Sequence, residues 1–214
     1  MKRVTFFGLL LMAATVVSFS SCTKDGDKDD DNTGSKTIKT GEIVVSSTEL
    51  YKDDWVYFSF ETGAEVEGID SVNFNGLLTW DIAFHSRLGR TNGGGSGKGV
   101  AAIYDAGTSD FNSVITVDNS KFFSDTTVNL ITGIGMFGPM YKAVPGNTVF
   151  DGAFEVDYSK HPPLYTCQNK VYVIKTVEGK YAKIQITGYF DEHGESGHIN
   201  FKYAYQTDGS VNLK

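Results

Sequence analysis

Residues 170–205 read KVYVIKTVEGKYAKIQITGYFDEHGESGHINFKYAY. This stretch contains three runs rich in β-branched and aromatic residues, Lys170–Thr176, Tyr181–Tyr189 and Ile199–Tyr205, separated by a Glu-Gly turn and a polar loop. Short turns between such runs are typical of antiparallel strands that follow one another in a sheet. The stretch therefore predicts a three-stranded meander.

Alternation along the meander predicts which side chains face a core, because successive side chains of a strand point to opposite faces. We expect an inward row in the second strand and another in the third, and an outward row between them. The inward rows are Ala182, Ile184 and Ile186, and Ile199, Phe201, Tyr203 and Tyr205; the outward row is Tyr181, Lys183, Gln185 and Thr187.

The rest of the chain also favours β structure. Aromatic residues make up 13% of the 214 residues, glycine occurs 24 times, and no long window shows a capped helical stripe. The run Leu78–Phe84 predicts a strand with Leu78, Trp80, Ile82 and Phe84 in a core and Asp81 on the opposite face. Further strands are expected at Glu42–Ser46, Trp55–Phe60, Val100–Tyr104, Ser113–Val117 and Thr148–Phe154.

Residues 129–166 differ in composition from the predicted strands. All four prolines of the chain lie here, with Met136, Met140, His161 and several aromatic residues. Proline and glycine predict loops, yet the segment is too apolar for ordinary solvated loops. Apolar loops on a β scaffold are suited to holding a flat, hydrophobic ligand.

The N-terminus resembles a secretory signal peptide. Lys2 and Arg3 precede a short apolar run, and Phe19-Ser20-Ser21 precedes Cys22 as in the lipobox of bacterial lipoproteins. We therefore expect residues 1–21 to be removed and Cys22 to be lipidated. A disulfide between Cys22 and Cys167 is the alternative for an exported protein.

Residues 22–39 predict a flexible tether, and residues 40–214 a single domain. The tether is polar and rich in aspartate, and it lacks a large apolar residue before Ile38. Loss of Lys2 and Arg3 with the signal changes the formal net charge from −7 to about −9. That charge disfavours nucleic acid and adhesion to anionic headgroups, so we expect membrane attachment through the lipid anchor only.

The glycine run at residues 92–99, NGGGSGKG, invites comparison with a phosphate-binding loop. Such a loop needs Ser or Thr after Gly-Lys and a helix beyond it, whereas here Gly99 follows Lys98 and the sequence VAAIYD predicts a strand. We interpret the glycines as a tight connection between two strands, in which some residues adopt positive φ.

No motif for catalysis or zinc binding is evident in the sequence. His193 and His198 lie in or beside a polar turn, and no HExxH motif, paired cysteines or serine nucleophile elbow occurs. We therefore expect a binding protein and not an enzyme. Cys167 is expected to be buried filler.

Haem binding needs few fixed motifs, because the iron takes His or Met axially while apolar side chains enclose the porphyrin. In the chain after Cys22, Met136 and Met140 are the only methionines, and His161 lies 25 residues after Met136. These residues are candidate axial ligands.

The stretch TWDIAFHSRLGRTNGGGSGKG, residues 79–99, resembles the signature of the HmuY family of haem-binding surface lipoproteins of Bacteroidetes. The pattern YVIKTVEGKYAKIQITGYFD, residues 172–191, is similar to that family as well, and the resemblance covers essentially the whole folded part. It implies an all-β domain of two antiparallel sheets with long apolar loops that hold haem.

The resemblance also implies a role and a site. The protein would capture haem, from host haemoproteins among other sources, and pass it to a TonB-dependent receptor in the outer membrane. Met136 and His161 would be the axial ligands, with Met140 as an alternative to Met136. Phe137, Tyr141, Tyr158 and Tyr165 would line the haem pocket. The alternative function is a surface lipoprotein whose apolar loops bind a protein or a glycan.

Overall fold

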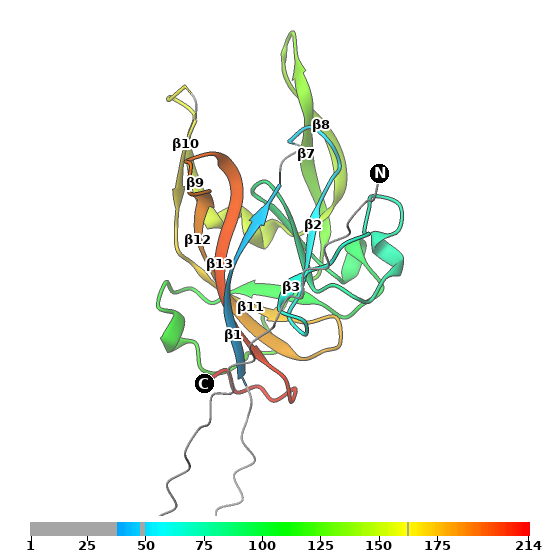
Figure 1. Ribbon diagram of the computed structural model, residues 1–214, viewed down its shortest axis with the longest axis vertical. Coiled ribbons are helices and arrows are strands. Elements are labelled where there is room, and N and C mark those ends of the chain that lie inside the picture. Colours follow the sequence, from blue (N-terminus) through cyan, green and yellow to red (C-terminus); the bar gives the residue numbers. More distant parts are fainter. Residues whose placement is uncertain (1–37, 48–49, 162) are drawn as a thin grey trace, which may run out of the picture. The chain divides into compact units, whose positions relative to one another are not determined.

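The computed structural model describes residues 38–47, 50–161 and 163–214 (Figure 1). All of them belong to one compact unit, Ser35–Lys214. The expected signal peptide, Cys22 and nearly all of the expected tether lie outside the described residues. The first strand begins at Ile38, two residues before the start we expected for the domain.

The larger sheet contains the predicted meander and two further strands. Its order is β1-β13-β12-β11-β6, and every neighbouring pair is antiparallel. The strands are β1 (Ile38–Ser46), β6 (Ala102–Asp105), β11 (Val171–Lys175), β12 (Tyr181–Phe190) and β13 (Ser196–Gln206). The meander is confirmed as β11, β12 and β13, and β1 and β6 complete the sheet at its two edges.

A second sheet has four antiparallel strands in the order β3-β2-β4-β5. They are β2 (Val56–Ser59), β3 (Ala64–Glu65), β4 (Ile82–His85) and β5 (Leu88–Thr91). Two hairpins form separate two-stranded sheets, β7 (Thr126–Gly135) with β8 (Gly138–Gly146), and β9 (Phe154–Asp157) with β10 (Leu164–Cys167). The prediction of an all-β domain with two main antiparallel sheets is confirmed.

The main core lies between the two larger sheets. Phe58 and Phe84 of the four-stranded sheet contact Phe201 of β13, with ring centroids 5.4 and 5.8 Å apart. The expected inward rows of β12 and β13 belong to this core: all seven side chains are buried. Burying one such large side chain contributes about 1.5–3 kcal/mol, so these rows account for much of the stability of the domain.

The strand prediction for Leu78–Phe84 was wrong at its N-terminal half. The strand begins at Ile82, and Leu78 is 57% exposed. Trp80 is buried in a second cluster, with Trp55 and Tyr57 among others, on the far side of the four-stranded sheet. Asp81 is buried as well, so this segment has apolar or hydrogen-bonded surroundings on both sides. Alternation fails for residues 78–81 because they precede the strand, and Trp80 and Asp81 are nevertheless buried because both faces of the sheet are covered.

The outward row of β12 was also partly wrong, because Lys183 and Gln185 are buried. The segment 109–114 covers this face. The Lys183 ammonium donates to the carbonyls of Phe111 and Val114 at 2.9 and 2.8 Å, and the Gln185 amide donates to the carbonyl of Ser109 at 2.6 Å. A long polar side chain thus remains hydrogen-bonded while its stem packs on apolar neighbours.

Three of the five other expected strands are present with shifted ends, as β1, β2 and β6. The remaining two are not strands. Thr148–Ala153 is a 3₁₀ helix, η4, because the Asn147 side chain accepts a hydrogen bond from the Val149 N–H and caps its start. In the expected strand Ser113–Val117, Ser113 ends η3 (Phe111–Ser113) and Thr116 makes one isolated bridge. The other 3₁₀ helices are η1 (Phe74–Gly76) and η2 (Gly94–Ser96).

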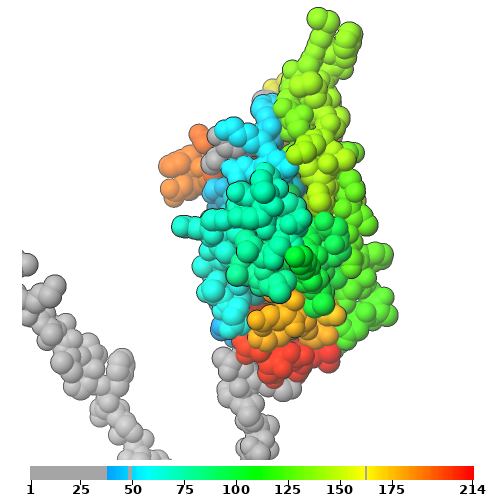
Figure 2. All heavy atoms as spheres, turned by 90° about the vertical axis from the view of Figure 1, so that its right-hand side faces the viewer, coloured from blue at the N-terminus to red at the C-terminus, as the bar shows by residue number. Residues whose placement is uncertain are grey.

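The loops expected between residues 129 and 166 are largely the two hairpins. Pro139 and Pro145 lie within β8, which has β7 as its single strand neighbour, so the missing N–H groups leave no second ladder incomplete. Both hairpins extend from the same end of the domain (Figure 1), and β7–β8 stands clear of the neighbouring surface in the space-filling view (Figure 2). No helix among the described residues is long and apolar enough to cross a membrane.

Candidate functional site

The tip of the β7–β8 hairpin carries a concentration of exposed apolar side chains. Five large ones occur within eight residues: Ile134, Met136, Phe137, Met140 and Tyr141. Met136 is 92% exposed and Phe137 is 100% exposed. Single exposed apolar residues are ordinary, but a group that gathers on one projecting element indicates an interaction surface.

Met136 and Phe137 form the two-residue turn of this hairpin. Gly135 and Gly138 are paired on either side of them, and Gly138 has a φ of +116°, which favours glycine. The turn residues have no place in the strand ladder and are not part of any described apolar cluster. Their side chains are therefore available to a ligand.

Met140 lies one step down the hairpin and is more constrained. It pairs with Gly133, and a Cβ atom on Gly133 would lie 2.9 Å from the Met140 Cε. The thioether thus lies over the glycine. By strand alternation Met140 shares a face with Lys142, whose ammonium contacts an Asp53 carboxylate oxygen at 2.8 Å, and with buried Val144. Met140 is 52% exposed, much less than Met136.

The β9–β10 hairpin holds the other predicted site residues. Tyr158 and His161 are exposed in its connection, with the first directly after β9. Tyr165 is half-buried in β10, where its ring centroid lies 4.6 Å from that of Tyr189. Tyr165 therefore packs against the main core, and of these three residues it has the least surface left for a ligand.

The predicted site residues thus separate into two groups on two hairpins. Met136, Phe137, Met140 and Tyr141 belong to β7–β8, whereas Tyr158, His161 and Tyr165 belong to β9–β10. No strand pairing joins the two hairpins within the described part of the chain. Both tips point the same way from the domain (Figure 1), so a ligand could contact both.

A small cavity lies beside the base of β7, lined by residues that include His85, Ser86, Leu88, Asn129 and Ile131. Its volume is about 30 Å³, whereas pockets for drug-sized ligands are typically about 300–1,000 Å³. A porphyrin could not enter it. The exposed surfaces of the two hairpins, by contrast, are open to a flat ligand.

The base of the β7–β8 hairpin is held by a buried carboxylate. Asp125, which precedes β7, accepts four hydrogen bonds: from the Thr91 N–H at 2.8 Å, the Thr91 hydroxyl at 2.6 Å, the Ser96 hydroxyl at 2.6 Å and the Asn147 amide at 2.9 Å. Asn147 directly follows β8, whereas Asp125 directly precedes β7. The Asp125 carboxylate therefore joins both ends of the hairpin to residues 92–99, which we call the glycine loop. Burial raises the pKa of Asp125, and the four donors act against that shift.

Close backbone approaches explain the glycine run. Gly94 has a φ of +55°, and a Cβ atom there would lie 2.4 Å from the Asp125 carbonyl oxygen. A Cβ atom on Gly97 would lie 2.0 Å from the Asn92 Oδ1. The interpretation of the run as a tight connection with positive φ is confirmed, and the connection also packs against the chain entering β7.

Arg90 connects the same region to the second apolar cluster, which contains Trp55 and Trp80 and is called the tryptophan cluster below. Its guanidinium carbon lies 3.4 Å from the Trp55 ring centroid and 4.5 Å from that of Phe74, and its Nη2 lies 3.7 Å from the Asp53 carboxylate. Burial lowers the pKa of Arg90 to about 10, so the group stays charged at neutral pH. Asp53 also contacts Lys142 of β8, so the ion pairs extend to the hairpin.

Sequence reasoning did not identify Asp125 or Asn147. Neither lies in a recognisable motif, and an isolated Asp or Asn is by default a surface residue. A usable signal would have been their position: each directly flanks a strand, where a buried polar side chain can satisfy the backbone of a neighbouring loop.

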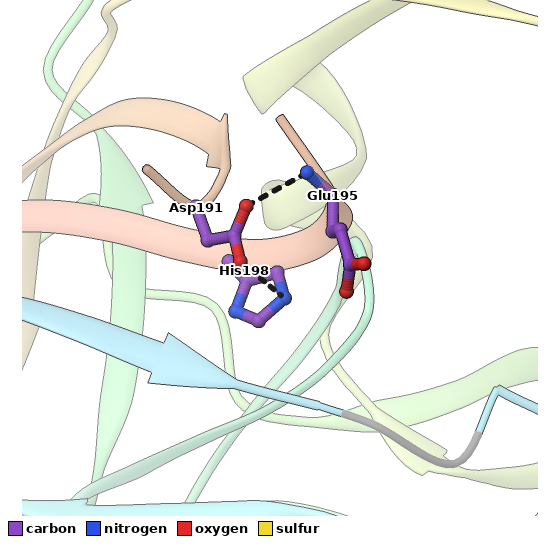
Figure 3. A group of neighbouring side chains, drawn as sticks. All are labelled: Asp191, Glu195 and His198. Atoms are coloured by element: carbon purple, nitrogen blue, oxygen red, sulfur yellow. Dashed lines mark hydrogen bonds and ion pairs between the residues drawn. The ribbon is translucent and has the colours of Figure 1, made fainter. Parts of the chain in front are cut away.

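A cluster of potential metal ligands that we did not predict lies at the turn from β12 into β13. Asp191, Glu195 and His198 place one donor atom each within 4.8 Å of one another (Figure 3). Cys167 is a free, half-buried thiol that donates to the Ile186 carbonyl at 3.2 Å, and burial raises its pKa. The thiol packs against the main core as expected for filler, but it is only half-buried, whereas we expected it to be buried.

Three solved structures that share this fold come from species of Bacteroides and Tannerella. A protein of Bacteroides vulgatus ATCC 8482, described as HmuY-like and haem-binding, is 24% identical with a TM-score of 0.59, covering 77% of this chain and 90% of its own. The apo HmuY analog of Tannerella forsythia is 20% identical with a TM-score of 0.63, covering 80% and 97%. A protein of Bacteroides fragilis NCTC 9343, described as a lipoprotein, is 23% identical with a TM-score of 0.61, covering 77% and 88%.

No curated protein is significantly similar in sequence. The HmuY protein family model, however, matches residues 51–203, which include both larger sheets apart from β1 and the last residues of β13, as well as both hairpins and the glycine loop. The match covers well over half of the chain, and it includes Thr91 and Ser96, which hydrogen-bond Asp125 at the base of the exposed hairpin. The chain belongs to the HmuY family.

Proposed function

We propose that the protein binds haem between the tips of the β7–β8 and β9–β10 hairpins. The observation that carries this proposal is the fully exposed pair Met136 and Phe137 at the tip of a firmly held hairpin. Exposed apolar surface on a rigid base is suited to a flat, hydrophobic ligand, and a thioether is a soft donor for haem iron. Family membership and the haem-binding description of the Bacteroides vulgatus protein support the same ligand.

Met136 and His161 are the proposed axial ligands. Met136 is preferred to Met140 because it is more exposed and because the Met140 thioether lies over Gly133. His161 is the histidine in the connection of the other hairpin, so the iron would be held from both sides. Phe137, Tyr141 and Tyr158 would contact the porphyrin faces, with Tyr165 at the rim near the core.

In the cell, the protein would act as a lipoprotein anchored in the outer membrane and exposed at the surface. The signal peptide and Cys22 motif support the anchor, and the acidic tether would let the domain extend from the membrane. The domain would capture haem, including haem released by host haemoproteins, and deliver it to a TonB-dependent receptor.

Absorbance titration of the purified protein with haemin tests the binding site. We compare wild type with Met136→Leu, which keeps the apolar volume but removes sulfur, and with His161→Ala. His193→Ala is the matched control, because His193 is an exposed histidine that belongs to neither hairpin. We expect Met136→Leu and His161→Ala to change the Soret band and weaken binding, while His193→Ala behaves as wild type.

Reduction with dithionite sharpens the test. A thioether favours ferrous iron relative to an imidazole pair, so we expect tighter binding of haem after reduction. An unchanged Soret band in both redox states would refute haem binding and favour a protein or glycan as the ligand of the hairpin tips. Binding that is insensitive to both ligand variants would retain haem but refute this ligand pair.

A further inference from the structure

The Asp191–Glu195–His198 cluster shares no residue with the proposed haem site and lies where β12 turns into β13. Asp191 directly follows β12, Glu195 directly precedes β13, and His198 lies within β13. The His198 Nε2 and an Asp191 carboxylate oxygen are 3.9 Å apart (Figure 3). The imidazole and the carboxylate thus face each other across a gap that one cation could fill.

Two of the three donors are held in place by other groups. The His198 Nδ1 is hydrogen-bonded to the Ser46 hydroxyl at 2.9 Å, across the β1–β13 pairing, which turns Nε2 toward Asp191. Metal-binding histidines commonly have their second ring nitrogen hydrogen-bonded in this way. The Asp191 Oδ1 accepts the N–H groups of Glu195 and His193, at 2.7 and 2.9 Å, so Oδ2 remains on the side of His198.

Solvent can reach the cluster, although two of its three side chains are mostly buried. It opens on a surface groove of about 660 Å³ lined in part by Val44, Ser46 and Phe190, together with Asp191 and His198. The side chains of His198 and Asp191 are only 15% and 19% exposed, whereas Glu195 is exposed at the rim. Rotation of the Glu195 side chain can bring its carboxylate onto an ion already held by the other two.

We propose that Asp191, Glu195 and His198 bind a divalent transition-metal cation of the Zn²⁺ class. One imidazole and two carboxylates are ligands that Zn²⁺ accepts, with water completing the shell. The imidazole favours a first-row transition metal over Ca²⁺ or Mg²⁺, which prefer all-oxygen sites. The site is independent of the haem proposal because it shares no residue with the hairpin tips.

Calorimetric titration of the EDTA-treated, dialysed protein with ZnCl₂ tests the proposal, with CaCl₂ as a parallel arm. We expect one Zn²⁺ per chain. Asp191→Asn keeps an oxygen acceptor for the two N–H groups but removes the charge, and His198→Ala removes the imidazole. Each should weaken Zn²⁺ binding by at least about tenfold, and Ser46→Ala, which releases the ring, by about tenfold.

His161→Ala is the matched control, because it removes an exposed histidine that lies outside the cluster and should leave Zn²⁺ binding unchanged. Circular dichroism and thermal unfolding in EDTA establish that each variant is folded. The proposal is overturned if the wild type takes up no Zn²⁺, if folded Asp191→Asn and His198→Ala bind it as the wild type does, or if His161→Ala loses binding equally. Binding of Ca²⁺ alone also overturns it.

Discussion

The base and the tip of the β7–β8 hairpin differ in burial, apolar packing and hydrogen bonding. At the base, Asp125 is buried and accepts four hydrogen bonds, and Val128, Leu130 and Val144 pack in the tryptophan cluster. At the tip, Met136 and Phe137 are exposed and belong to no described apolar cluster. One hairpin thus combines a base that contributes stability with a tip that leaves apolar side chains exposed, where we propose that haem binds.

The largest effect on the base is expected from Asp125→Ala. The substitution leaves the donors of Thr91, Ser96 and Asn147 without their shared acceptor in a buried site, and each unsatisfied group costs about 1–3 kcal/mol. We expect the free energy of unfolding to fall by about 4 kcal/mol in urea denaturation. A loss below about 1 kcal/mol would mean that the carboxylate does not hold the hairpin.

The pH dependence of stability probes the second buried carboxylate beside the glycine loop, Asp81. Its oxygens accept the N–H groups of Phe60 and Val177, and burial raises its pKa from 3.8 to about 6. Between these values the native state keeps a proton that the unfolded state has lost. The contribution of Asp81 therefore falls as pH rises from about 4 to 6, by about 3 kcal/mol in total.

Asp81→Asn removes this titration, so urea denaturation of the two proteins across that pH range isolates it. Several exposed carboxylates with lowered pKa, such as Asp118 and Asp157, act in the opposite direction in both proteins and cancel in the comparison. Parallel stability curves for wild type and variant would contradict the assignment.

Gly94→Ala is expected to have a smaller effect, about 2 kcal/mol, since it combines a positive φ with backbone contact at Asp125. Gly68→Ala is the matched control: Gly68 has a φ of +78°, but no atom lies within 4 Å of the position that a Cβ would take, so about 1 kcal/mol is expected there. Thermal unfolding distinguishes the two. Equal losses would show that the close approach to Asp125 adds nothing to the preference for glycine.

The smallest effect on stability is expected at the tip. Phe137→Ser should change the free energy of unfolding by less than about 0.5 kcal/mol, because the side chain is fully exposed. The same substitution should weaken haem binding in the absorbance titration, since it removes apolar surface from the proposed site. A strongly destabilised Phe137→Ser would break the contrast between base and tip.

The sequence correctly predicted the side chains that face the main core. The inward rows of β12 and β13 were correct because these strands pack one face on the main core. Prediction failed where a third layer covers a sheet. Lys183 and Gln185 look like solvent-facing residues in the sequence, but segment 109–114 lies over them. Trp80 and Asp81 are buried for the equivalent reason on the four-stranded sheet.

The candidate site was predictable in part. Composition identified residues 129–166 as an unusual apolar segment, and the family resemblance directed attention to Met136, Met140 and His161. Proline and glycine content suggested loops, because local sequence does not reveal that a strand has a single neighbour and can accommodate proline. The three ligands of the metal cluster are close together in the sequence, but the segment reads as an ordinary polar turn, and only the structure shows that Ser46 of β1 orients the His198 ring toward Asp191.

By itself, the sequence determined the all-β class, the meander and the resemblance to the HmuY family, since these depend on periodicity, turn residues and local motifs. Only the tertiary structure decided that Thr91 and Ser96 hydrogen-bond Asp125 at the base of a hairpin, and that Met136 and Phe137 are exposed at its tip. It also decided that the Asp191 and His198 side chains face each other. Burial and long-range hydrogen bonds depend on which segments meet in space, and a local pattern carries no information about such meetings.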